Sequence, residues 1–180
     1  MNLDEKTLES NTLFKGKVID LALDTVLLPN GEKATREVVK HRGGVAVIAE
    51  DDNGNILMVK QFRYPYEEVI YEIPAGKRDS YDEEPLDCGK RELKEETGAT
   101  AKEFFPLGKL YPSPGYCGET IWIFAAKGLT FSTQNLDDDE FLNVERIPFD
   151  KAVEMVMNGE ISDAKTQIAI LKYKEIMKNC

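Results

Sequence analysis

The segment "GKRELKEETG", residues 89–98, carries three glutamates and three basic side chains between two glycines. Helix signals surround it, because Pro85 stands where a first turn would begin and Gly98 stands where a helix would end. We therefore predict a helix over residues 85–97. A helix this rich in carboxylates must either face solvent, with ion pairs along its surface, or place its acids around a cation.

The spacing of the acids determines where on this helix they lie. Glu92 and Glu96 are four residues apart and share one face, and Glu95 lies beside that face. With Glu83 just before the helix, four carboxylates converge, and each raises the pKa of the others unless a cation neutralises them. Mg²⁺ or Mn²⁺ suits such an all-oxygen site. Spacing alone favours the alternative of a solvated, salt-bridged face, in which Arg91 pairs with Glu95.

Short apolar strands separated by turn signals account for most of the remaining chain. We expect strands in residues 13–41 and in "GGVAVIAE", "NILMVKQF", "EVIYEIPAG", "ETIWIFAAKGL" and "NVERIPF". Asn53 and Gly54 tolerate a positive φ and predict a hairpin between the first two of the quoted strands. Helices are expected over residues 151–158, capped by Asp150, and from about residue 165. This mixture indicates an α/β or α+β fold in which a sheet lies between helical layers.

Length and composition limit the functions open to this chain. Its 180 residues fit one domain with a small N-terminal extension, and its net charge of -10 argues against nucleic-acid binding. Three cysteines without CxxC spacing are typical of reduced thiols. The first residues carry no secretion signal, and no apolar run is long enough to span a membrane. We therefore expect a cytoplasmic protein with neither membrane nor nucleic-acid partners.

The sequence around the acidic helix resembles the Nudix box, G-x5-E-x7-R-E-U-x-E-E-x-G-U, in which U is aliphatic. The stretch "GKRDSYDEEPLDCGKRELKEETGA" starts at Gly76 and agrees with the box from Glu83 to Ala99. It departs before Glu83, where six residues rather than five follow Gly76, so we infer one added residue in that loop. Agreement at so many polar and glycine positions reverses the preference for a solvated face.

The resemblance to the Nudix family implies an α/β/α sandwich with a mixed central sheet. It also implies a divalent-metal enzyme that hydrolyses a nucleoside diphosphate linked to another group. Carried over from the box, Glu92 and Glu96 are the principal metal ligands. Glu95 is implied as a further or water-bridged ligand, and Arg91 as the residue that orients the acids. The remaining implied positions are a metal-binding backbone carbonyl, a supporting acid and two structural glycines: Ala75, Glu83, Gly76 and Gly98.

Beyond the box, residues 35–175 resemble the ADP-ribose pyrophosphatase subfamily. The resemblance rests on "REVVKHRGGVAVIAEDDNGNILMVKQFRYPYEEVIYEIPAGK" and "LYPSPGYCGETIWIF", and on Pro114, fifteen residues past the box, a mark associated with ADP-ribose hydrolases. It implies hydrolysis of ADP-ribose to AMP and ribose 5-phosphate with Mg²⁺, or with Mn²⁺. Two alternatives stay open: a pyrophosphatase for UDP- or GDP-linked sugars, and a Nudix module that binds ADP-ribose without cleaving it.

The subfamily resemblance also implies a general base on a mobile loop, and the acidic stretch "LDDDEF" occupies the corresponding position. We favour Glu140 as the base, with Asp138 or Asp139 completing a metal shell, and Asp137 is a further candidate. A solvated acidic loop is the alternative for this stretch.

Substrate contacts are implied on both sides of the box. Arg63 is expected to hold a phosphate or the terminal ribose, because arginine offers a bidentate fork. Arg36 and Glu37 are expected to reach the adenine-ribose end from the neighbouring subunit, with a surface ion pair as the alternative for Arg36. Glu119 is expected to contact substrate or metal, or else to be a surface acid of an edge strand.

The subfamily resemblance further implies a homodimer built partly from exchanged N-terminal strands. We therefore predict that residues 1–42 serve dimerisation and that residues 43–180 form the Nudix hydrolase domain. The partners expected for this chain are thus a nucleotide-sugar substrate and a second copy of itself.

Overall fold

The computed structural model describes residues 2–136 and 140–178 and divides the chain into two compact units. One unit comprises Met1–Gly43 with Tyr111–Thr120, and the other comprises Gly44–Leu110 with Ile121–Cys180. Within the described ranges, no helix has both the length and the apolar composition that crossing a membrane requires.

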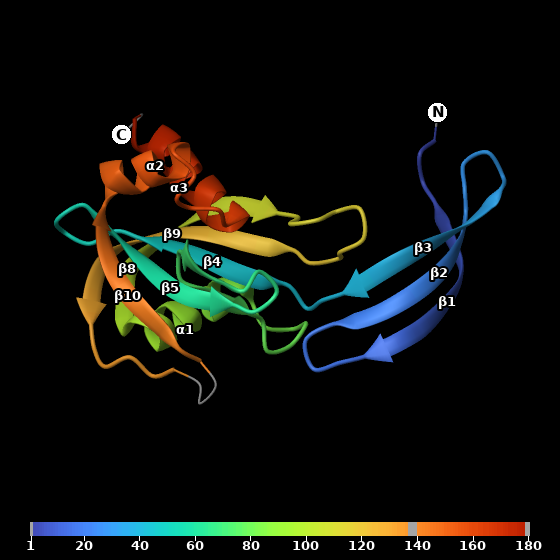
Figure 1. Ribbon diagram of the computed structural model, residues 1–180, viewed down its shortest axis with the longest axis horizontal. Coiled ribbons are helices and arrows are strands. Elements are labelled where there is room, and N and C mark those ends of the chain that lie inside the picture. Colours follow the sequence, from blue (N-terminus) through green and yellow to red (C-terminus); the bar gives the residue numbers. More distant parts are fainter. Residues whose placement is uncertain (1, 137–139, 179–180) are drawn as a thin grey trace. The chain divides into compact units, whose positions relative to one another are not determined.

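Three antiparallel strands form the sheet of the first unit, in the order β1 (Lys6–Lys15), β2 (Asp20–Leu27) and β3 (Lys33–Lys40) (Figure 1). The middle strand β2 buries Ala22 and Val26, whereas every residue of β1 is exposed. These strands make up the N-terminal strand extension that the sequence predicts.

Two sheets form the core of the second unit. The mixed sheet has the order β7-β4-β9-β8, and the antiparallel sheet has the order β10-β5-β6. Their strands are β4 (Gly44–Ala49), β5 (Asn55–Arg63), β6 (Glu68–Glu72), β7 (Ala75–Lys77), β8 (Ala99–Leu110), β9 (Ile121–Phe131) and β10 (Leu142–Pro148). Because β4 runs parallel to β9 and antiparallel to β7, the expected mixed sheet is confirmed.

Helices cover the mixed sheet on both faces, and in Figure 1 α1 lies on the opposite side from α2 and α3. Their bounds are α1 (Pro85–Thr97), α2 (Phe149–Met157) and α3 (Ala164–Met177). The central strand β4 is buried on both faces. Val45 and Val47 pack on the side of α1, whereas Ala46 and Ile48 join the core under α2 and α3. This layering confirms the α/β/α sandwich.

The turn of the predicted hairpin between β4 and β5 is present, but the pairing of the two strands is not. Its turn forms as expected, since Gly54 adopts a φ of 75° and Asp51 Oδ1 accepts a hydrogen bond from the backbone N–H of Asn55. The two strands nevertheless enter different sheets and meet beyond the turn at the isolated bridge between Glu50 and Ile56. The predicted strand pairing is wrong because β7 and β9 already occupy both edges of β4.

The stretch "EVIYEIPAG", expected as one strand, forms two strands in different sheets. β6 ends at Glu72 and pairs with β5, whereas β7 starts at Ala75 and pairs with β4. Pro74 lies between them and has no N–H to donate, while its carbonyl accepts from the Val47 N–H at 2.8 Å. The break turns the chain from one sheet to the other immediately before Gly76 of the box.

The predicted helices are confirmed, with one correction at the start of α2. α1 spans the predicted residues, with Pro85 in its first turn and Gly98 at its C-cap with a φ of 69°. Asp163 caps α3 with its side chain. Asp150, predicted to cap α2, lies inside the first turn instead, because β10 runs directly into the helix and places Pro148 at the N-cap.

Candidate active site

The acids of α1 lie where this helix packs against β7 and the mixed sheet. Glu92 and Glu96 are 8% and 3% exposed, and only the side chain of Glu95, at 37%, reaches solvent to a large extent among these three. A solvated helix face therefore does not describe Glu92 and Glu96. Their burial leaves two carboxylates that need partners inside the protein.

The backbone of strand β7 lies against both buried acids. A Cβ placed on Gly76 would lie 2.0 Å from Glu92 Cδ and 2.2 Å from each of its carboxylate oxygens, so only glycine leaves room for this side chain. One residue earlier, the Ala75 N–H donates to Glu96 Oε2 at 2.9 Å. The break after β6 thus places the backbone of Ala75 and Gly76 next to the two carboxylates.

Arg91 joins the remaining acids of the box. Its Nη1 donates to Glu92 Oε1 and to Glu95 Oε2, each at 2.9 Å, and its Nε donates to Glu83 Oε1 at 3.1 Å. Burial alone would lower the pKa of Arg91, but these acids raise it above its ordinary value. The pKa of Glu83 is pushed up by burial, yet hydrogen bonds from Arg91 and from the Asp79 N–H outweigh this effect and hold it below its usual range. One guanidinium therefore organises three carboxylates.

The two buried acids have strongly raised pKa values. Burial raises the pKa of Glu92 to about 7, although Arg91 opposes the shift. Burial also raises the pKa of Glu96 to about 8, and the negative charges of Glu92 and Glu140 add to the effect. Buried acids with perturbed pKa values are typical of functional sites, because the charged form of a buried carboxylate needs a cation or a hydrogen-bond donor close to it.

These residues fit a hard divalent cation. The donors are all oxygens, and a cation beside Glu92 and Glu96 would stabilise their charged forms. Among residues 2–136 and 140–178, no group of three or more Asp, Glu, His or Cys side chains is close enough together to hold a metal ion without rearrangement. Arg91 and the Ala75 N–H instead occupy oxygens of the two buried carboxylates.

The acidic loop follows β9, and its first residues are hydrogen-bonded to the C-terminal end of α1. The Ser132 N–H donates to the Gly98 carbonyl at 2.7 Å, and the Asn135 N–H donates to the Glu95 carbonyl at 3.0 Å. Gln134 Nε2 donates to the carbonyl of Glu96. A Cβ on Gly98 would lie 2.3 Å from the Ser132 carbonyl oxygen, which explains the glycine at this position.

Of the acids proposed in this loop, Glu140 is described and is partly buried. Its charge contributes to the raised pKa values of Glu92 and Glu96, so it lies within electrostatic reach of both. Asp137, Asp138 and Asp139 lie outside the described residues.

Arg63, expected at the substrate, ends β5 and is bound to a carboxylate that the sequence analysis missed. Its Nη2 donates to Glu72 Oε2 at 2.7 Å, and its Nε donates to Glu72 Oε1. Lys165 of α3 donates to the same carboxylate, which is 1% exposed. The charge of Glu96 contributes to the raised pKa of Arg63, after the larger effect of Glu72, so this network lies within electrostatic reach of Glu96.

The sequence does indicate that Glu72 is unusual, because it is a charged residue inside the apolar stretch "EVIYEIPAG". A fully buried carboxylate needs cationic partners, which the sequence alone could not identify.

The expected adenine-side residues belong to the first unit. Arg36 of β3 donates to both carboxylate oxygens of Glu5, through Nε at 2.9 Å and Nη2 at 2.5 Å. The surface ion pair named as the alternative for Arg36 is therefore present, and the substrate role stays a prediction. Glu37, the next residue of β3, is exposed.

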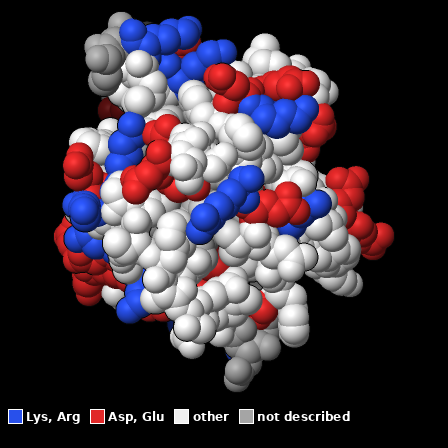
Figure 2. Space-filling view, turned by 90° about the vertical axis from the view of Figure 1, so that its left-hand side faces the viewer, with Lys and Arg blue, Asp and Glu red and all other residues white. Residues whose placement is uncertain are grey.

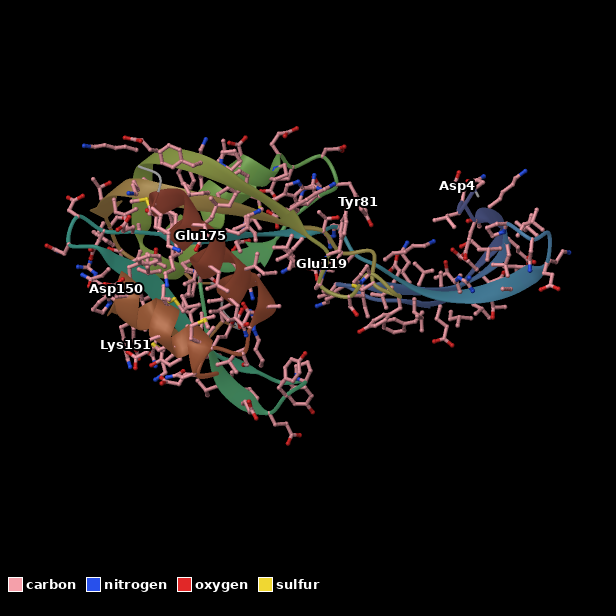
Figure 3. All side chains as sticks on the ribbon, turned by 90° about the horizontal axis from the view of Figure 1, so that it is seen from above. Asp4, Tyr81, Glu119, Asp150, Lys151 and Glu175 are labelled. Atoms are coloured by element: carbon pink, nitrogen blue, oxygen red, sulfur yellow. The ribbon has the colours of Figure 1, made fainter. Side chains whose placement is uncertain are left out.

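Glu119 and Pro114 also belong to the first unit, in the segment that connects β8 to β9. Glu119 Oε1 lies 3.3 Å from His41 Nδ1. Pro114 is exposed in a turn closed by the Cys117 N–H, which donates to the Ser113 carbonyl at 2.9 Å. Figure 3 labels Glu119.

Basic and acidic side chains are interspersed on the face of the protein shown in Figure 2. Lysines and arginines there alternate with acidic and uncharged residues.

Comparison with protein-family models divides the chain close to the boundary between its two units. The NUDIX domain model matches residues 40–167, and the model of the nucleoside diphosphate sugar hydrolase N-terminal domain matches residues 5–39. A solved ADP compounds hydrolase shares the fold, with a TM-score of 0.85 at 20% identity over 99% of this chain and 97% of that chain.

Several relatives are similar over much of the chain. An ADP-ribose pyrophosphatase of Bacillus subtilis (strain 168) is 46% identical, and a methanol dehydrogenase activator of Bacillus methanolicus is 40% identical. Both alignments cover 98% of this chain and 97% of the relative. A GDP-mannose pyrophosphatase of Yersinia enterocolitica is 33% identical over 78% of each chain. Because its box acids meet at α1 and the family model matches most of its length, the chain belongs to the Nudix family of hydrolases.

Proposed function

We propose that this Nudix hydrolase cleaves the pyrophosphate bond of ADP-ribose and releases AMP and ribose 5-phosphate. The observation that carries the proposal is the pair of buried carboxylates, Glu92 and Glu96, held by β7 with raised pKa values. Similarity to an ADP-ribose pyrophosphatase over nearly the whole of both chains supports the choice of substrate.

Glu92, Glu96 and the backbone carbonyl of Ala75 are the proposed ligands of Mg²⁺ or Mn²⁺, with Glu95 and Asp139 as further ligands. When bound, such a cation neutralises the pyrophosphate and lowers the pKa of a coordinated water. An all-oxygen donor set supports either of these metals over zinc.

Residues around the metal ligands are proposed to orient the acids and to accept a proton. Arg91 orients Glu92 and Glu95 through its paired hydrogen bonds, and Glu83 holds the guanidinium from the other side. Glu140 is proposed as the general base that accepts the proton of the attacking water. Its partial burial and its electrostatic effect on Glu92 and Glu96 support this role.

Arg63 is proposed to bind a substrate phosphate or the terminal ribose. Glu72 holds its guanidinium in place, and this fixed geometry favours bidentate recognition of an anion. Lys165 shares Glu72 and adds a second cation to the same network.

We further propose a cytoplasmic homodimer in which residues 1–42 serve assembly and residues 43–180 carry the catalytic acids. In such a dimer, Arg36 and Glu37 would contact the adenine-ribose end of the substrate in the other subunit. Glu119 would contact substrate or metal, and Pro114 would have a structural role. The exposed surface of β1 supports an assembly role for the first unit.

Relatives named GDP-mannose pyrophosphatase favour a second candidate, hydrolysis of GDP- or UDP-linked sugars. These relatives are less similar and cover less of the chain than the ADP-ribose pyrophosphatase. A Nudix module that binds ADP-ribose without cleaving it is the remaining alternative, which the retained box acids disfavour.

The proposal is tested by incubating the purified protein with Mg²⁺ and ADP-ribose and quantifying AMP and ribose 5-phosphate by chromatography. We expect kcat/KM to be higher for ADP-ribose than for GDP-mannose or UDP-glucose. Glu96→Gln should reduce turnover by several orders of magnitude, whereas the matched change at an exposed acid of β8, Glu103→Gln, should leave it unchanged. Absence of AMP would overturn the proposal, and calorimetric binding of ADP-ribose without turnover would establish the binding module instead.

A further inference from the structure

The loop between Gly76 and Glu83 is one residue longer than in the Nudix box, yet Glu83 still reaches Arg91. Other contacts must therefore hold the longer loop so that Glu83 keeps its position beside Arg91. Two of the loop's own hydrogen bonds are long: the Glu83 N–H donates to the Ser80 carbonyl at 3.4 Å, and the Asp82 N–H donates to Ser80 Oγ at 3.3 Å. Among the loop's own contacts, the Asp79 N–H makes a short one, to Glu83 Oε2 at 2.7 Å. The two long bonds contribute little, so the backbone at residues 80–82 is held mainly by contacts from outside the turn.

Arg78 adds two short hydrogen bonds from its side chain to the backbone of this loop. Its Nε donates to the Glu83 carbonyl at 2.7 Å, and its Nη2 donates to the Tyr81 carbonyl at 2.5 Å. Tyr81, labelled in Figure 3, is itself exposed, so its side chain does not anchor the loop in a core. A single planar guanidinium therefore bridges two carbonyls across the lengthened segment.

The guanidinium of Arg78 is in turn held by the mixed sheet. It lies over the ring of Trp122 on β9, 5.1 Å from the ring centroid. A planar cation stacked on an aromatic ring loses little further freedom when it donates its hydrogen bonds. Arg78 thus connects the loop to a rigid element.

From Glu83 a continuous series of contacts leads to the buried acids. Glu83 Oε2 accepts from the Asp79 N–H at 2.7 Å, and Glu83 Oε1 accepts from Arg91 Nε at 3.1 Å. Arg91 then donates to Glu92 and Glu95, each at 2.9 Å. Displacing the loop would therefore release Arg91 and change where these carboxylates lie.

We propose that Arg78 is a positioning residue that fixes the lengthened loop and, through Glu83 and Arg91, sets the placement of the metal-binding acids. The inference rests on the proposed function of those acids, and it assigns a task to a position that the box motif leaves unspecified. Removing a partner that hydrogen-bonds a metal ligand directly changes metal affinity by about 10- to 100-fold. Arg78 acts through Glu83 and Arg91, so an effect at the lower end of that range is expected.

The test compares Arg78→Met, which keeps the aliphatic stem, with Arg78→Lys, which keeps the charge but lacks the planar fork. In calorimetry without substrate, Arg78→Met should weaken Mn²⁺ binding about 10-fold, and Arg78→Lys should recover only part of this loss. Amide hydrogen exchange of residues 79–83 should accelerate in both variants. The KM for ADP-ribose should stay unchanged while kcat falls.

Two further variants separate positioning from general effects. Lys90→Met removes an exposed cation near the start of α1 and should change neither Mn²⁺ affinity nor loop exchange. In a Glu83→Gln background, Arg78→Met should add little, because Arg78 acts through Glu83.

Unchanged exchange and unchanged Mn²⁺ affinity in Arg78→Met would overturn the inference, as would fully additive effects of the two substitutions. Because neither readout needs turnover, the result is distinguishable from a failure of ADP-ribose hydrolysis.

Discussion

Among single residues, Gly76 has the most direct effect on the site, because it makes room for the Glu92 carboxylate. We predict that Gly76→Ala displaces this carboxylate, since the new Cβ would lie 2.0 Å from Glu92 Cδ. Moving a catalytic group by about 1 Å costs roughly 100-fold in turnover. AMP release from ADP-ribose and calorimetric Mn²⁺ binding both measure the effect, and both should fall.

Gly115→Ala is the matched control for an added methyl group, because nothing lies within 4 Å of a Cβ at that position. Its Mn²⁺ binding should equal that of the unaltered protein. If Gly76→Ala binds Mn²⁺ equally well, Glu92 does not need its present position to bind metal.

Removing the metal should make stability depend on pH between about 4.5 and 8. A glutamate has an ordinary pKa of 4.5, whereas burial raises the pKa of Glu92 to about 7 and that of Glu96 to about 8. Over this range the folded protein binds more protons than the unfolded chain, so its free energy of unfolding falls as the pH rises. Urea unfolding of the EDTA-treated protein at several pH values measures this slope.

The slope should become shallower in Glu96→Gln, which cannot ionise, and in saturating Mg²⁺, which stabilises the charged carboxylates. A free energy of unfolding that rose with pH over the same range would show that both acids are already ionised in the folded, metal-free protein.

Among the secondary-structure elements, α1 was the easiest to predict from sequence. Its bounds follow from Pro85 and Gly98, and the agreement with the Nudix box identifies its acids. The pairing of β4 was not predictable, because local turn chemistry at Gly54 gives no information about which distant strands occupy the edges of β4. The Glu72 network was missed for the same reason, since its partner Lys165 is far away in the sequence.

The Glu72 network ties β6 to α3 and should contribute strongly to stability. Glu72→Gln would leave Arg63 and Lys165 facing each other without the shared negative charge. Breaking a fully buried ion pair costs about 3–5 kcal/mol. Because the Arg63 side chain is 38% exposed and Lys165 keeps Asp163 as a partner, we expect a loss of about 2 kcal/mol here. Urea unfolding at neutral pH should show a loss of that size.

An exposed ion pair provides the matched comparison. Glu154→Gln removes the partner of Lys151 on the surface of α2 and should change the free energy of unfolding by less than about 1 kcal/mol. Equal losses for Glu72→Gln and Glu154→Gln would show that the buried network does not stabilise the fold.

For the whole molecule, the exposed strand β1 leads us to predict a dimer. The side chain of Leu13 is among its exposed apolar groups, at 60% exposure, and Leu8 and Phe14 are exposed as well. Sedimentation equilibrium should give about twice the chain mass of 20.3 kDa. Leu13→Glu should shift the protein toward the monomer, because it would bury a charge at the interface.

Ser10→Glu adds the same charge at a polar position of β1 and should perturb the dimer less. A monomeric mass for the unaltered protein at micromolar concentration would contradict the proposed assembly.

The position of β4 between β7 and β9 has a consequence for the order of folding. β4 is an early segment of its unit, but its parallel partner β9 leaves the ribosome only after the whole of α1 and β8. Long-range parallel pairing of this kind is intrinsically slow, because the loop must close before the contacts form. During synthesis, Glu92 and Glu96 therefore emerge well before the sheet that buries them is complete. We expect the metal site to be among the last parts of the nascent chain to mature.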